Sequence, residues 1–166
     1  GEYRWHYQTT PRDRWDYTAT QQIMLADLPL GEGGADRRVV MQAPKNGFFY
    51  VLDAADGELI SATPFTNQNW TTGEFDEDGR PVLVEEAVDL ALYAVIPGPT
   101  GAHNWHPMAF NPDTGLVYSP VNEIPFFYDK TRNVDDSKSF WNLGYDAAAG
   151  WPVEYPAGTL DAIADM

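Results

Sequence analysis

The sequence contains no cysteine. A disulfide framework, a thiolate metal site and a cysteine nucleophile are therefore all excluded, and the redox compartment is left open. Apolar runs of about 20 residues, the length needed to span a bilayer as a helix, are also missing. We expect no membrane-spanning helix.

Basic residues are scarce as well. The chain has 10 Lys and Arg against 25 Asp and Glu, which gives a formal net charge of −15. Nucleic acids and anionic lipids are bound through clustered Lys and Arg, so neither is an expected partner. An acidic surface can also steer a basic protein partner, but solubility is the simpler interpretation.

Apolar and turn-forming residues are plentiful. Of the 166 residues, 43% are hydrophobic and 14% aromatic, which is enough to bury the core of one ordinary domain. The 14 Gly and 13 Pro are scattered rather than periodic. This distribution favours a protein of strands and turns over a helical one.

The first half of the chain reads as short strands. The candidates are residues 3–8 ("YRWHYQ"), 21–28, 38–43, 47–53 and a short strand within 54–62. The Asn-Gly of "PKNG" is a strong hairpin signal between two of them, and the Asp-Gly of "AADG" marks another tight turn. The pattern predicts a four-stranded antiparallel meander.

The second half is less regular. We expect a polar surface loop at 67–81, weak helical spacing at 82–95, an irregular Pro/Gly loop at 96–107 and a strand–turn–strand unit at 108–122, with mostly loop from 123 to 166. "VLDAADGELIS" and "AFNPDTGLVYS" repeat a strand, an Asp-containing turn and a strand, which suggests a β-propeller. Because both ends read as incomplete units, we expect a piece of something larger.

The residues alone leave the candidate sites ambiguous. Asp16, between Trp15 and Tyr17, is either a turn carboxylate or a catalytic base. His103 and His106 have a spacing that suits metal ligands on a helix, but they lie in a Pro/Gly loop, so a zinc site is not expected. "DEDG" at 76–79 lacks the spacing of an EF-hand and is interpreted as an acidic turn.

Three longer motifs together resemble one family. "WHYQTTPRDRWDYTATQ", "APKNGFFYVLD" and "PGPTGAHNWHPMAFNPDTGLVYSP" are similar to the quinoprotein alcohol dehydrogenases. The resemblance implies an all-β fold, a segment of an eight-bladed β-propeller made of four-stranded antiparallel blades, of which the chain covers about two to three. It divides the chain into a first matched blade region (1–65), a loop insertion (66–95), a second matched blade region (96–122) and mostly loop (123–166).

The resemblance also assigns roles to single residues. Asp16 is implied as the catalytic base and as a residue near the metal, Lys45 as a contact of the quinone oxygens, and Asn104 and Trp105 as part of the cofactor pocket. Relatives that use a lanthanide generally carry a second aspartate two positions after the base. Thr18 stands there, so the resemblance favours calcium.

The implied function is that of a periplasmic enzyme dependent on pyrroloquinoline quinone (PQQ) and calcium. Such an enzyme oxidises small alcohols to aldehydes by hydride transfer to the quinone and passes electrons to cytochrome c or a similar acceptor. The family's Cys-Cys pair, its other metal ligands and its haem motif are not matched, so the remaining blades are implied as partners. The alternative is a non-catalytic propeller segment that serves as a scaffold or binding module.

Overall fold

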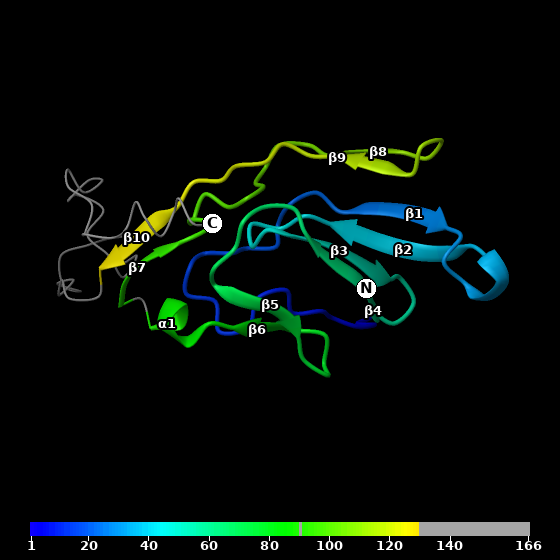
Figure 1. The fold of residues 1–166 in the computed structure, drawn as a ribbon. Coiled ribbons are helices and arrows are strands. Elements are labelled where there is room, and N and C mark those ends of the chain that lie inside the picture. Colours follow the sequence, from blue (N-terminus) through cyan, green and yellow to red (C-terminus); the bar gives the residue numbers. More distant parts are fainter. Residues whose placement is uncertain (90, 130–166) are drawn as a thin grey trace.

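The computed structural model describes residues 1–89 and 91–129 of the chain. In these residues the protein is built from strands, with one 3-10 turn and one short helix (Figure 1). The elements are β1 (Met24–Leu28), η1 (Glu32–Gly34), β2 (Arg37–Gln42), β3 (Phe48–Asp53), β4 (Leu59–Pro64), β5 (Thr71–Phe75), β6 (Pro81–Leu83), α1 (Glu85–Val88), β7 (Ala91–Val95), β8 (Ala109–Asn111), β9 (Leu116–Tyr118) and β10 (Phe126–Asp129).

The main sheet is an antiparallel meander in the order β1-β2-β3-β4. It confirms the four-stranded unit predicted from the first half of the sequence. The Asn-Gly turn lies where it was expected, between β2 and β3, and Gly47 there has a φ of +93°. A side chain at this φ is strained, so glycine suits the turn.

Three further pairs of strands complete the described part. They are β5 with β6, β8 with β9, and β7 with β10, all antiparallel. The hairpin of β8 and β9 confirms the strand–turn–strand unit predicted within residues 108–122. No helix in the described ranges has the length and apolar character required to cross a bilayer.

The structure differs from the sequence expectation in three segments. Residues 3–8 form no strand, and they are held by side-chain hydrogen bonds from Trp5 to Ala54 O and from Tyr7 to Gly79 O. The described residues between 67 and 95 contain β5, β6 and β7, and among them only α1 is helical. The expected loop from residue 123 contains β10, and its remainder, 130–166, lies outside the described residues.

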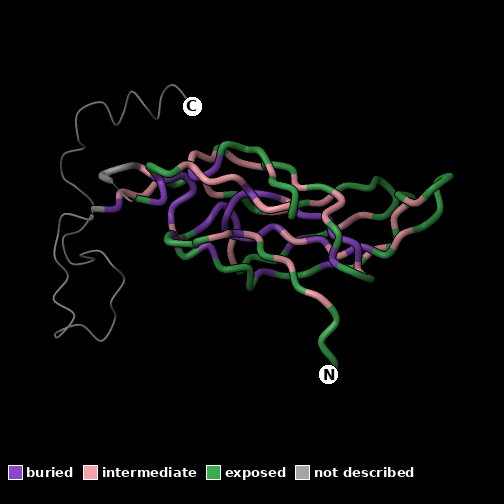
Figure 2. Tube along the Cα trace, turned by 90° about the horizontal axis from the view of Figure 1, so that it is seen from below, coloured by how far each residue is buried: buried purple, intermediate pink, exposed green. Residues whose placement is uncertain are grey.

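Hydrophobic residues pack in two clusters, and β3 contributes to both. Successive strand residues point to opposite faces, so Phe48 and Tyr50 join an aromatic cluster while Val51 joins a methionine-rich one. Figure 2 shows that the buried positions run through the interior and that the N-terminal segment is exposed. The aromatic cluster comprises Trp15, Tyr17, Phe48, Tyr50, Trp70, Ala87, Val88, Val95 and Tyr128.

Candidate active site

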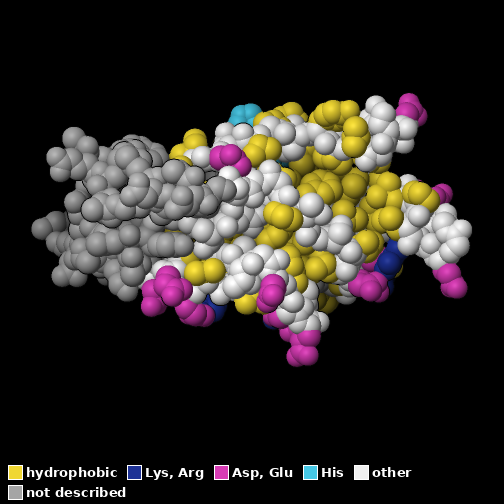
Figure 3. Space-filling view, in the orientation of Figure 1, with side chains coloured by type: hydrophobic (Ala, Val, Ile, Leu, Met, Phe, Trp, Pro, Cys, Tyr) yellow, Lys and Arg dark blue, Asp and Glu magenta, His cyan; other side chains and the backbone are white. Residues whose placement is uncertain are grey.

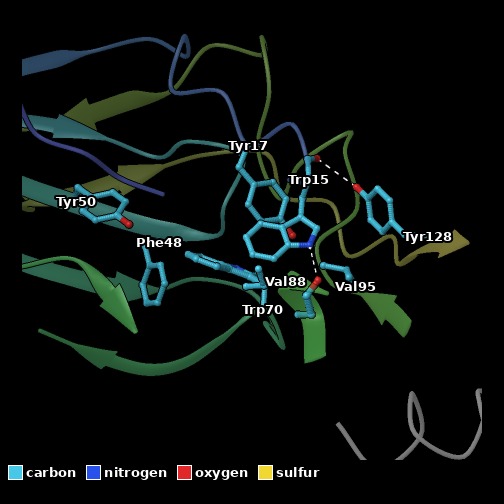
Figure 4. Packing of buried hydrophobic residues seen from close by; sticks show 9 residues of the cluster. Trp15, Tyr17, Phe48, Tyr50, Trp70, Val88, Val95 and Tyr128 are labelled. Atoms are coloured by element: carbon cyan, nitrogen blue, oxygen red, sulfur yellow. Dashed lines mark hydrogen bonds between the residues drawn. The ribbon is translucent and has the colours of Figure 1, made fainter. Parts of the chain in front are cut away.

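Asp16 is presented at the surface by two buried neighbours. Trp15 and Tyr17 are almost fully buried in the aromatic cluster, with their ring centroids 5.4 Å apart, and both rings pack on Trp70 (Figure 4). The side chain of Asp16 between them is 64% exposed. Its φ of +66° lies in the left-handed region, which aspartate tolerates better than most residues. Strained backbone of this kind gathers at functional sites.

Polar contacts fix the chain on both sides of Asp16. Trp15 donates from Nε1 to Ala87 O at 3.2 Å, and the Tyr128 hydroxyl donates to Trp15 O at 3.3 Å. The Tyr17 hydroxyl donates to Pro97 O. Burial is the largest of the causes that raise the pKa of Tyr17 well above its usual value, so this hydroxyl stays protonated and keeps its donor role. The aromatic pair therefore anchors the carboxylate.

Lys45 reaches Asp16 from the turn between β2 and β3. Its Nζ donates to Asp16 Oδ2 at 2.8 Å. The Lys45 side chain is only 10% exposed, so a nearly buried ammonium meets a largely exposed carboxylate. A nearly buried charge needs a partner of opposite sign, and Asp16 supplies it. The two residues are 29 positions apart in sequence, and the structure brings them into direct contact.

Asn46 holds the turn that carries Lys45. This amide is fully buried, and both ends of its side chain form hydrogen bonds. Its Oδ1 accepts from Phe48 N. The backbone carbonyl of Asn46 accepts from Trp70 Nε1 at 3.0 Å, which ties the turn to the aromatic cluster. The contacts of Nδ2 are with Thr9 O, Thr10 Oγ1 and Tyr50 Oη.

The loop at residues 98–104 lies against the same turn. Ala102 N donates to Lys45 O at 2.9 Å. Asn104 donates from Nδ2 to Thr100 O, while its buried Oδ1 has no hydrogen-bond partner within the described residues. A buried polar atom without a partner calls for an explanation, and an absent ligand is one. Trp105 is 86% exposed and belongs to neither core cluster.

These residues fit a cofactor that carries both oxygen atoms and a donor group, with a cation beside it. Lys45 offers an ammonium that donates to oxygen, whereas Asp16 and the unsatisfied Asn104 Oδ1 offer acceptors for a cation or for an N–H or O–H donor. A calcium ion takes six to eight oxygen ligands, of which Asp16 would supply one or two. Across residues 1–89 and 91–129, no group of three or more His, Cys, Asp or Glu is placed to hold a metal ion. Further carboxylate ligands of calcium would therefore have to come from elsewhere.

Sequence reasoning missed two neighbours of the site. His103 was considered only as a metal ligand, but both of its ring nitrogens face backbone carbonyls. Gly101 was treated only as part of an irregular loop. Its φ of +81° and its closeness to Lys45 mean that a residue with a side chain would be strained at this position. Neither role leaves a side-chain motif, because both depend on backbone geometry.

Comparison with known proteins agrees with this geometry. The family model described as "Glucose/ethanol/alcohol dehydrogenase, beta-propeller domain" (PQQ) matches residues 1–74. Together with the antiparallel sheets, this match defines the class: the chain is a segment of a β-propeller.

Comparison with individual relatives identifies the family within the β-propeller proteins. Over 143 residues, which are 86% of this chain and 19% of the relative, it is 52% identical to a quinohemoprotein alcohol dehydrogenase of Comamonas testosteroni. It is 44% identical to a 1-butanol dehydrogenase (cytochrome c) of Thauera butanivorans over 98% of this chain and 24% of the relative. The chain belongs to the PQQ-dependent (quinoprotein) alcohol dehydrogenase family.

Solved structures give the same result. Quinohemoprotein alcohol dehydrogenase ADHIIG from Pseudomonas putida HK5 superposes with a TM-score of 0.71 at 54% identity, over 75% of this chain and 19% of that one. A europium-containing methanol dehydrogenase superposes with a TM-score of 0.63 at 35% identity, over 70% of this chain and 20% of that one. The chain thus spans about a fifth of the length of these relatives.

Proposed function

We propose that this chain supplies part of the active site of a PQQ- and calcium-dependent alcohol dehydrogenase, with Asp16 as the general base. The observation that carries the proposal is the pair formed by Asp16 and Lys45, 2.8 Å apart. Its carboxylate is exposed to an incoming substrate and its ammonium is nearly buried. Asp16 is also held rigidly by its two anchored aromatic neighbours.

Each of the chain's own site residues would then have a separate role in the reaction. Asp16 takes the hydroxyl proton of the alcohol at Oδ1, while Oδ2 stays bonded to Lys45. Lys45 presents a fixed positive charge that stabilises negative charge on a neighbouring oxygen in a site shielded from water. Asn104 orients the cofactor edge by accepting, at its free Oδ1, a hydrogen bond from an N–H or O–H group of the cofactor. PQQ, when bound, supplies the two-electron oxidant that no side chain provides.

Calcium is proposed as the metal, with Asp16 as the ligand from this chain. A carboxylate is a preferred ligand of hard cations such as calcium. Thr18, in place of a second aspartate two residues after Asp16, supports calcium over a lanthanide. The metal would act as a Lewis acid on the cofactor and orient the substrate oxygen.

The proposed acceptor of electrons is cytochrome c or a similar protein, and the proposed location is the periplasm. Support for the acceptor comes from the relative named 1-butanol dehydrogenase (cytochrome c). The location rests on the family resemblance. A primary alcohol is the proposed substrate class.

Further blades are proposed as the structural partners of this chain. Large apolar side chains remain exposed on β1 and β9, among them Leu25, Leu116 and Tyr118. Figure 3 shows hydrophobic side chains gathered over the face formed by the main sheet and the hairpin of β8 and β9. Adjoining blades would cover an apolar face of this kind, since large apolar patches mark interaction surfaces.

Reconstitution of the PQQ-free parent protein tests the proposal. We expect PQQ with calcium to restore reduction of an artificial dye by a primary alcohol, PQQ with a chelator to leave it inactive, and lanthanide to restore less activity than calcium. Variants Asp16→Ala and Lys45→Ala should both abolish the restored activity. If PQQ does not bind and neither substitution matters, the enzyme proposal fails and the chain is a scaffold or binding module.

A further inference from the structure

His103 is a fully buried histidine with a backbone carbonyl at each ring nitrogen. Nδ1 lies 2.6 Å from Ala43 O, and Nε2 lies 2.8 Å from His106 O. A carbonyl oxygen only accepts, so each contact needs an N–H on the ring. A neutral imidazole carries one N–H, whereas the doubly protonated ring carries two. Only the doubly protonated form satisfies both contacts.

The two carbonyls belong to the two segments that build the candidate site. Ala43 lies just after β2 and two residues before Lys45. His106 lies two residues after Asn104. The ring therefore connects the turn that carries Lys45 to the loop that carries Asn104. The bond from Ala102 N to Lys45 O joins the same two segments next to it.

We propose that His103 is a positioning residue that donates hydrogen bonds from both ring nitrogens and so fixes Lys45 relative to Asn104. The importance of these two residues for the reaction rests on the proposed function, but the connection itself does not. Hydrogen bonds from a charged donor are stronger than neutral ones, which offsets the cost of a buried cation.

Chemical labelling of Lys45 in the PQQ-free parent protein tests the connection without any enzymatic activity. His103→Leu removes both donors at similar volume, and His103→Gln keeps one donor group. We measure the rate of Lys45 acylation by mass spectrometry. Because hydrogen bonds from a charged donor are lost, this rate should rise about tenfold in His103→Leu and less in His103→Gln. His106→Gln is the matched control, because its side chain is exposed and its carbonyl is unchanged. It should label like the wild type.

A measurement on the unaltered protein covers the case in which a variant fails to fold. With histidine labelled by ¹⁵N, NMR should show both nitrogens of His103 protonated. A ring with one unprotonated nitrogen, or a folded His103→Leu variant whose Lys45 reacts at the wild-type rate, would overturn the proposal.

PQQ affinity separates this proposal from the proposed function. If the proposed function and the role of His103 are both correct, the PQQ dissociation constant should rise about tenfold in His103→Leu, because hydrogen bonds from a charged donor are lost. It should stay unchanged in His106→Gln. If wild-type protein does not bind PQQ, the proposed function fails, and the labelling and NMR results still decide the role of His103.

Discussion

Gly101 lies directly against the aliphatic stem of Lys45. A Cβ built at Gly101 would be 2.7 Å from Lys45 Cβ and closer still to Cγ, distances that real side chains do not adopt. The φ of Gly101 is +81°, which is also unfavourable for other residues. The loop thus approaches the lysine because this position has no side chain.

Replacing Gly101 by alanine should therefore displace Lys45. We expect Gly101→Ala to weaken PQQ binding about tenfold or more, since the new methyl group cannot fit unless the lysine moves, and overpacking costs about 1–3 kcal/mol. Gly115→Ala is the matched control, because Gly115 has a φ of +68° and nothing within 4 Å of its added Cβ. Both variants share the backbone penalty. Equal PQQ dissociation constants for the two, measured by fluorescence titration, would contradict the steric argument.

Asp16→Asn should remove the base and preserve the structure. The asparagine Oδ1 can still accept from Lys45, but the nearly buried ammonium loses its counter-charge, so the thermal midpoint should fall while the fold is kept. Turnover should fall by about 10²–10⁴-fold, the usual contribution of a general base. Asp36→Asn, at an exposed aspartate, should turn over like the wild type. Steady-state kinetics with a primary alcohol checks this, and a drop of less than about tenfold would remove Asp16 from the base role.

Asn46→Ala should destabilise the protein at the turn that carries Lys45. The substitution leaves the buried Phe48 N–H and Thr10 Oγ1 without their amide partner and removes one bond each from Thr9 O and Tyr50 Oη, a loss of about 1–3 kcal/mol. Urea denaturation measures the change. In the control Asn122→Ala, the bond to Ala102 O comes from the backbone N–H and is retained. A control as unstable as Asn46→Ala would show that the amide network adds nothing.

Stability should fall in acid partly through Asp53. The N–H of Ala55 and then the guanidinium of Arg37 lower the pKa of the Asp53 carboxyl below its usual value. A lowered pKa in the folded state contributes stability above the unfolded value, about 3.9, and this contribution is lost as the pH falls through the folded value. Asp53→Asn should therefore be less stable than wild type at neutral pH and lose less below about pH 4. Parallel urea midpoints across this range would refute the assignment.

The parts of the fold that the sequence predicts are those made by neighbouring segments. The meander of β1 to β4 and the hairpin of β8 and β9 each follow from apolar strands separated by Gly- or Asp-containing turns. The pair of β7 and β10 joins segments 31 residues apart at Val95 and Phe126, and no local pattern indicates that pairing. β5 was missed because its "TTGEF" carries a glycine and an acid.

The residues of the candidate site also fall into those that the sequence indicates and those that it does not. Asp16 and Lys45 were identified through the resemblance, and the structure places them in contact. Trp105 was expected to line the pocket; its side chain is exposed in the described structure, and its place in the pocket stays a prediction. Gly101 and His103 act through a positive φ and through backbone carbonyls, which residue type and spacing do not encode.

The hydrogen bond from Tyr128 to Trp15 has a consequence for biosynthesis. Its partners are 113 residues apart, so the "WDY" segment leaves the ribosome long before its last anchor exists. Contacts of high sequence separation form slowly because a long loop must close first. A nascent chain truncated before β10 should therefore hold the segment around Asp16 through Ala87, Pro97 and Lys45 alone, and the carboxylate gains its last anchor only after synthesis has passed residue 128.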